Sequence, residues 1–254
     1  NHVSDTVSVI DTDAGSPTYH HVIASVQDME TLATRFDEPV GVTFADNQKA
    51  YVALSPQNEI AIVDVETYSV VGRLPISAQD PRAITVREDR LYVIPFESNN
   101  QTQLSGCWPF VPSDICTFDA REHIFTNNNV LSLDYDADII KNPDLPDRDL
   151  YVFDTATDEL VEIVDTVGTL LYDLTVDSEG KVYVAQTDAR NDVNGRAGTL
   201  KHSLFEMENR AFLNQITSVD CSGDNCDTPV YFDLEPLPPV HPEKSLALAT
   251  PYGI

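Results

Sequence analysis

The sequence predicts an all-β fold built from repeated units of four antiparallel strands, and three observations support this prediction. Nearly the same apolar segment occurs three times, as AYVAL at 50–54, LYVIP at 91–95 and VYVAQ at 182–186. A short alternating strand and a polar turn precede each copy, and hairpin signals recur along the chain. Self-similarity of this kind is the signature of repeat architectures, so the repeat predicts the fold before any single residue is interpreted.

The strands of one unit follow the same order each time. The first strand is an alternating segment, such as PVGVTF or PRAITV, and the second is the YV segment. The third and fourth strands form a hairpin, in which an apolar strand ends in Asp or Glu and a polar turn of the Asp-Thr-x-Thr type reverses the chain. The hairpins are predicted at 7–26, 59–76, 149–167 and, more weakly, 203–219.

The spacing of the units predicts a β-propeller, in which four-stranded blades bury each other's faces around a central channel. Pro39 to Pro81 is 42 residues, close to the roughly 40 to 45 residues of a propeller blade. The two longer intervals that follow contain one YV segment each, so each holds one blade plus an insertion. Within a single propeller portion, 1–254, the predicted divisions are a half blade at 1–38, a blade at 39–80, a blade at 81–168 with an insertion at 99–147, a blade at 171–220, an inter-blade connection at 221–250 and the start of the next blade at 251–254.

Several motifs resemble those of a known family. The YVAL, YVIP and YVAQ strands, the VSVIDT, AIVDVET and YVFDTAT hairpins, and the PVGV, PRAI and PYGI phrases resemble the YVTN-repeat family of bacterial and archaeal surface propellers, which includes surface-layer and lactonase-like proteins. The resemblance covers nearly the whole chain apart from 99–147 and about 221–245. It implies a propeller at the cell surface, and its motifs are specific for fold but almost silent about function.

The resemblance also implies that the chain is incomplete as a propeller. Propellers of this family usually close with about seven blades, whereas the repeats account for about half to two-thirds of such a ring. An open propeller leaves sheet faces and edges unburied, which favours aggregation. We therefore expect further blades to come from the same chain or from another chain.

Composition limits the classes of partner. The chain carries 42 acidic and 15 basic residues, a formal charge of -27, which repels phosphate backbones and anionic lipid surfaces. This charge argues against nucleic acid as a partner. No segment approaches the roughly 18 to 20 consecutive apolar residues that cross a bilayer, so we expect no membrane insertion.

The four cysteines form two local pairs, Cys107 with Cys116 and Cys221 with Cys226. A disulfide within each pair is the favoured interpretation, and a zinc site formed by four thiolates is the alternative. Neither pair has the C-x2-C spacing of a zinc ribbon or knuckle. Disulfides predict an extracytoplasmic location, whether secreted, periplasmic or at the cell surface.

The repeat register predicts one candidate site at the channel mouth, where the innermost strands begin. Propellers generally bind ligands there. The polar and aromatic residues at these positions are Arg82, Tyr172, Asp173 and Tyr252. The alternative is that they only line a water-filled channel and hold the blades in register.

The insertion at 99–147 is a second candidate, because long loops on a rigid scaffold often carry binding function. Trp108, Phe110 and Phe118 offer an aromatic surface for a protein or a glycan. The alternative is that these side chains dock the loop on its own blade.

Two acidic segments suggest calcium as a cofactor, because calcium prefers hard oxygen ligands. The first contains Asp134, Asp136 and Asp138, and the second contains Asp188 and Asp192. The first segment lacks the glycine and glutamate of an EF-hand loop, since Ile139 and Leu145 occupy those positions. Solvated acidic loops are the alternative for both segments.

Two functions remain open from the sequence. The favoured one is a secreted or cell-surface propeller that acts as a binding or scaffold module for a protein or glycan. The alternative is a subunit or domain of an enzyme, either a lactonase-like hydrolase or the partner of a redox module such as a di-haem cytochrome, with a metal or ligand at the channel mouth. Binding is favoured because the sequence contains no G-x-S-x-G, H-E-x-x-H or phosphate-binding glycine motif.

Overall fold

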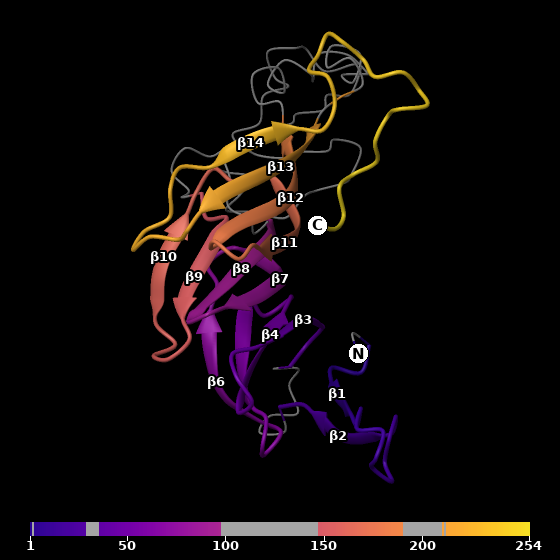
Figure 1. The fold of residues 1–254 in the computed structure, drawn as a ribbon, viewed down its shortest axis with the longest axis vertical. Coiled ribbons are helices and arrows are strands. Elements are labelled where there is room, and N and C mark those ends of the chain that lie inside the picture. The colour runs from indigo at the N-terminus through magenta and orange to yellow at the C-terminus, as the bar shows by residue number, and fades with distance from the viewer. Residues whose placement is uncertain (2, 29–35, 98–146, 190–209, 211) are drawn as a thin grey trace, which may run out of the picture.

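The protein is all-β, as predicted (Figure 1). The computed structural model describes residues 1, 3–28, 36–97, 147–189, 210 and 212–254. Every regular element in these ranges is a strand, and every strand pairing is antiparallel. The described ranges contain no helix of the length and apolar character that a membrane span requires.

The N-terminal part of the chain forms a hairpin followed by a complete four-stranded blade. The hairpin pairs β1 (Val7–Ile10) with β2 (Val22–Val26) as a separate two-stranded sheet. The four strands of the first complete blade lie side by side in chain order. They are β3 (Pro39–Phe44), β4 (Lys49–Leu54), β5 (Glu59–Asp64) and β6 (Ser69–Pro75).

Two further blades follow, and a single bridge from Leu170 to Glu97 joins them into one sheet of eight strands. The first of these blades contains β7 (Gln79–Arg87), β8 (Arg90–Glu97), β9 (Leu150–Asp154) and β10 (Leu160–Val164). The last blade contains β11 (Leu170–Val176), β12 (Lys181–Ala189), β13 (Phe212–Asp220) and β14 (Val230–Asp233). The described sheets follow one another as an open portion of a β-propeller, with β1–β2 at one end and β14 at the other (Figure 1).

The aspartate that ends each third strand caps the turn that follows. The Asp64 carboxylate accepts hydrogen bonds from the Thr67 amide (2.7 Å) and hydroxyl (2.8 Å), and Asp154 binds the Thr157 amide in the same way (2.8 Å). A short carboxylate that binds the backbone ahead of it is a turn-forming device. The equivalent residues in the hairpin and the last blade are Asp11 and Asp220.

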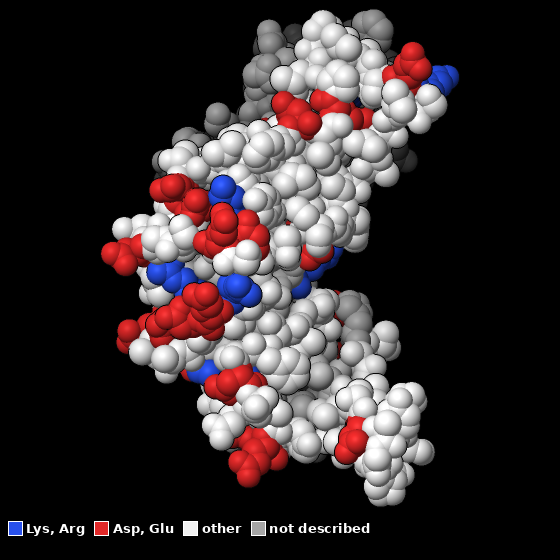
Figure 2. Space-filling view, viewed as in Figure 1, with Lys and Arg blue, Asp and Glu red and all other residues white. Residues whose placement is uncertain are grey.

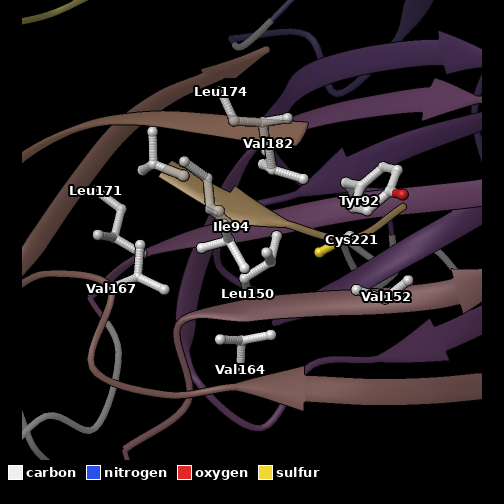
Figure 3. Close-up of a cluster of buried hydrophobic side chains, with 12 residues drawn as sticks. Tyr92, Ile94, Leu150, Val152, Val164, Val167, Leu171, Leu174, Val182 and Cys221 are labelled. Atoms are coloured by element: carbon white, nitrogen blue, oxygen red, sulfur yellow. The ribbon is translucent and has the colours of Figure 1, made fainter. Parts of the chain in front are cut away.

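The YV motif places apolar side chains on both faces of a blade, because neighbouring residues of a strand point to opposite sides. In β4, Val52 and Leu54 pack toward the hairpin that precedes the blade, whereas Tyr51 and Ala53 pack toward the blade that follows. In β8, Tyr92 likewise packs toward the last blade (Figure 3). The core therefore consists of apolar layers between successive sheets.

The fourth strand of the last blade lies in a different place from the one expected. Residues 221–250 were expected to form an inter-blade connection, yet β14 lies within them and pairs with β13. The turn-forming aspartate of this blade is Asp220, so the hairpin turn comes after β13 and not within 203–219. Residues 203–209 lie outside the described ranges.

Candidate functional site

The first strands of the three described blades lie side by side, at the place where the sequence predicts a channel mouth. β7 contacts β3 on one side and β11 on the other. Gly41 of β3 comes so close to β7 that a Cβ atom at this position would lie 2.6 Å from the Arg82 carbonyl oxygen. Glycine is required for this approach, because any larger residue would collide with backbone.

A row of stacked side chains runs from one blade to the next beside these first strands. The Arg82 guanidinium carbon lies 4.2 Å from the centre of the Phe96 ring. The Phe96 ring meets Tyr172 edge-on at 5.6 Å between centroids, and Tyr172 meets Tyr252 at 5.2 Å. These four residues are called the mouth row. The structure thus brings together three of the four predicted mouth residues, and it adds Phe96.

Phe96 was missed because it belongs to a second strand, whereas the prediction considered only first strands. A second strand runs antiparallel to the first, so its last residues return to the mouth. The residue lies at the end of the YV strand, in LYVIPFE. Extending the repeat register to the ends of second strands would have identified it.

Asp173, the fourth predicted residue, holds the last residues of the chain beside β11. Its carboxylate accepts a hydrogen bond from the Ile254 amide (3.2 Å) and another from the Leu174 amide (2.9 Å). This contact positions Tyr252, which is 69% exposed at the end of the mouth row. Asp173 therefore acts as an anchor for the phrase PYGI.

The Tyr172 hydroxyl remains protonated at neutral pH. Burial raises its pKa, although the hydrogen bond with Thr187 and the charge of Arg82 act in the opposite direction. The oxygen lies 3.3 Å from the Thr187 hydroxyl. The mouth row therefore presents three aromatic rings, one guanidinium and the hydroxyls of Tyr172 and Tyr252, which suit recognition by packing and hydrogen bonding.

The predicted calcium ligands are described only in part. Asp188 lies in β12, where burial raises its pKa and the Thr169 hydroxyl donates a hydrogen bond to it at 3.4 Å. Its proposed partner Asp192, and Asp134, Asp136 and Asp138, lie outside the described residues. Within the described ranges, no three His, Cys, Asp or Glu side chains form a group that could hold a metal. The calcium hypothesis stays a prediction.

One of the two predicted cysteine pairs is described, and it forms a disulfide. Cys221 and Cys226 are bonded, with an S–S distance of 2.08 Å, in the turn between β13 and β14. The Cys226 amide donates a hydrogen bond to Glu162 of the preceding blade at 2.8 Å. Cys107 and Cys116 lie outside the described residues, as do Trp108, Phe110 and Phe118 of the insertion.

Sequence comparison finds neither a matching family profile nor a matching curated protein, but solved structures do match. Kuenenia stuttgartiensis hydrazine synthase is 14% identical with a TM-score of 0.42, and the match covers 94% of this chain and 62% of that one. RRP9 WD40 repeats are 9% identical with a TM-score of 0.47, covering 85% and 43%. The WD40 propeller domain of Doa1 is 9% identical with a TM-score of 0.42, covering 72% and 41%. The chain spans less than two-thirds of each of these structures.

Proposed function

We propose that this chain is a binding module of a YVTN-type β-propeller, and that the channel mouth is its contact surface for a protein partner. The convergence of Arg82, Phe96, Tyr172 and Tyr252 from three separate parts of the sequence carries this proposal. Arginine, tyrosine and other aromatic residues dominate the energetics of protein interfaces, because they combine a large contact area with hydrogen-bonding groups. This composition favours a protein over a glycan.

The proposed location is extracytoplasmic, either secreted, periplasmic or at the cell surface. The Cys221–Cys226 disulfide supports this location, because disulfides persist in oxidising compartments. Carboxylates also outnumber basic groups on the face drawn in Figure 2. A surface of this kind resists nonspecific association with other anionic surfaces.

To test this proposal, the immobilised chain is used to capture proteins from the secreted and surface fraction of the source organism. The captured proteins are then quantified by mass spectrometry. Tyr252→Ala removes the exposed ring, and Arg82→Ala removes the cation; both should release the same captured protein. Phe44→Ala is the matched control, because Phe44 is 60% exposed at the opposite end of β3. Capture that survives both mouth substitutions would contradict the proposal.

A glycan array probed with the same variants provides the contrasting arm. Glycan binding that depends on Tyr252 would make the mouth a carbohydrate site instead. The insertion at 99–147 is a separate proposed contact, and Trp108→Ala tests it in the same capture assay. Loss of capture in Trp108→Ala but not in the mouth variants would assign the partner to the insertion.

A further inference from the structure

Within the described ranges, Arg82 is the one half-buried arginine whose guanidinium has no hydrogen-bond acceptor. Each of the others donates to a carboxylate, carbonyl or hydroxyl oxygen; these are Arg73, Arg90, Arg148 and Arg210. Arg82 lacks such an acceptor although the chain carries 42 acidic residues and 15 basic ones. A guanidinium in this state can bind a group that comes from outside the described part of the chain.

The Phe96 ring covers one side of the Arg82 guanidinium, whose carbon lies 4.2 Å from the ring centre. The five N–H donors of a guanidinium lie around its edge, in the plane of the group. A ring on one side therefore stabilises the cation and leaves these donors for another group. Both side chains are half-buried, so the guanidinium is held in position before a partner binds, which reduces the entropy lost on binding.

The described residues around Arg82 supply no compensating negative charge. Asp80 and Asp173 lie near Arg82 and Tyr172 in the first strands, but their carboxylates accept hydrogen bonds from other groups. Burial raises the pKa of Tyr172 and the charge of Arg82 lowers it, whereas no described carboxylate shifts it. Arg82 is therefore an unpaired cation beside aromatic rings in a strongly acidic protein.

We propose that the mouth row recognises a single carboxylate of its partner, which binds Arg82, together with an apolar side chain next to that carboxylate. This inference rests on the proposed function, since it takes the mouth row as the contact surface, and it adds the chemical group that is recognised. A carboxylate accepts two parallel hydrogen bonds from the fork of a guanidinium, and such a pair is stronger than hydrogen bonds between neutral groups. The rings of Phe96 and Tyr172, 5.6 Å apart, supply the apolar contact area beside it.

The net charge of the chain favours one carboxylate over a more highly charged group. A formal charge of -27 repels phosphate groups and clusters of carboxylates. A single carboxylate experiences less of this repulsion, which salt screens over distance, whereas its direct contact with a half-buried guanidinium is screened much less. The carboxylate belongs either to an Asp or Glu side chain or to the C-terminus of a peptide chain. Both sources present the same group, and the experiment separates them.

An array of random heptapeptides tests this proposal, with amidated C-termini on one half of the array and free C-terminal carboxylates on the other. On the amidated half, the peptides that bind the labelled chain should contain Asp or Glu next to an apolar residue. Binding confined to the other half would identify the C-terminal carboxylate as the recognised group. The peptides that bind most tightly are then made again with this carboxylate replaced by its carboxamide, and both forms are titrated in solution.

The unmodified chain should bind the carboxylate form about tenfold more tightly than the carboxamide form. Arg82→Gln should bind the two forms equally, because it keeps a hydrogen-bond donor but lacks the charge and the fork. Arg82→Lys, which keeps the charge, should retain part of the difference. Arg87→Gln is the matched control and should retain all of it, since Arg87 is an exposed arginine at the other end of β7.

The outcomes separate this inference from the proposed function. A preference for the carboxylate form that survives Arg82→Gln overturns the inference, and so does an array on which the unmodified chain and Arg82→Gln bind every peptide equally. Peptides that depend on Tyr252 but show no preference for a carboxylate overturn the inference and leave the mouth row as the contact surface. Peptides that bind equally well to Tyr252→Ala and Arg82→Gln contradict both. Far-UV circular dichroism confirms that the variants are folded.

Discussion

Removal of the Tyr51 hydroxyl tests whether its hydrogen bond to Asp158, in the β9–β10 turn of the next blade, stabilises the packing of adjacent blades. Tyr51 is fully buried, and Tyr51→Phe deletes its hydrogen bond to Asp158 and a longer one, of 3.5 Å, to the Thr155 carbonyl oxygen, without opening a cavity. A hydrogen bond to a charged group contributes about 1.5 to 3 kcal/mol. The Asp158 side chain is 28% exposed and retains Lys49 at 3.0 Å, so the lower limit of about 1.5 kcal/mol applies.

Urea unfolding followed by circular dichroism measures this loss, and Tyr183→Phe is the matched control. The control removes the same atom from the equivalent position, but its hydrogen bond of 3.3 Å joins an exposed turn of the same blade. Its effect should therefore be much smaller. In thermal unfolding, Tyr51→Phe should lower Tm by about 3 to 6 °C. Equal losses in the two variants would refute the idea that the Tyr51–Asp158 hydrogen bond stabilises the contact between blades.

Three further predictions concern stability. Gly41→Ala should destabilise the chain by about 1 to 3 kcal/mol in the same urea assay, because the new methyl group would collide with the backbone of β7; a neutral result would contradict the close packing of the innermost strands. Replacing Cys221 and Cys226 with serine should cost about 2 kcal/mol, since the disulfide closes a short turn, and dithiothreitol should lower the Tm of the unmodified chain but not of the variant. Hydrogen bonds from the Thr67 and Thr157 amides lower the pKa of Asp64 and Asp154 below 3.8, the usual value. The two carboxylates therefore contribute fully to stability above pH 3.8, and this contribution disappears as the pH falls through their lower pKa in the folded state. The decline of Tm with acid should be shallower in Asp64→Asn than in the unmodified chain.

The repeat predicted the fold because the residues that form each interface between blades lie in short segments of the sequence. A strand that is buried on both faces needs apolar side chains at successive positions, and the YV motif supplies them. The capping aspartates mark the hairpins in the same way, since the carboxylates of Asp64 and Asp154 accept hydrogen bonds from residues of their own turns. In the last blade the hairpin was predicted within 203–219, whereas the capping aspartate is Asp220. The fourth strand of this blade was therefore predicted at the wrong position.

Repeat register also predicted three side chains that lie in one row where the first strands begin. Arg82, Tyr172 and Tyr252 belong to the mouth row, and Asp173 anchors the segment that carries Tyr252. Phe96 was not predicted, because its position in the mouth row depends on how far β8 pairs with β7. Strand length is decided by pairing and not by composition alone.

By itself, the sequence determined the YV strands, the turns capped by Asp64 and Asp154 and the Cys221–Cys226 disulfide, because each depends on residues only a few positions apart. Only the tertiary structure decided which distant turns the side chains of Lys49 and Arg90 reach. Lys49 and Asp158 are 109 positions apart, and Arg90 and Gly223 are 133 apart. Local patterns carry no information about such pairs, since the contact exists only after successive blades have packed face to face and brought distant turns within hydrogen-bonding distance.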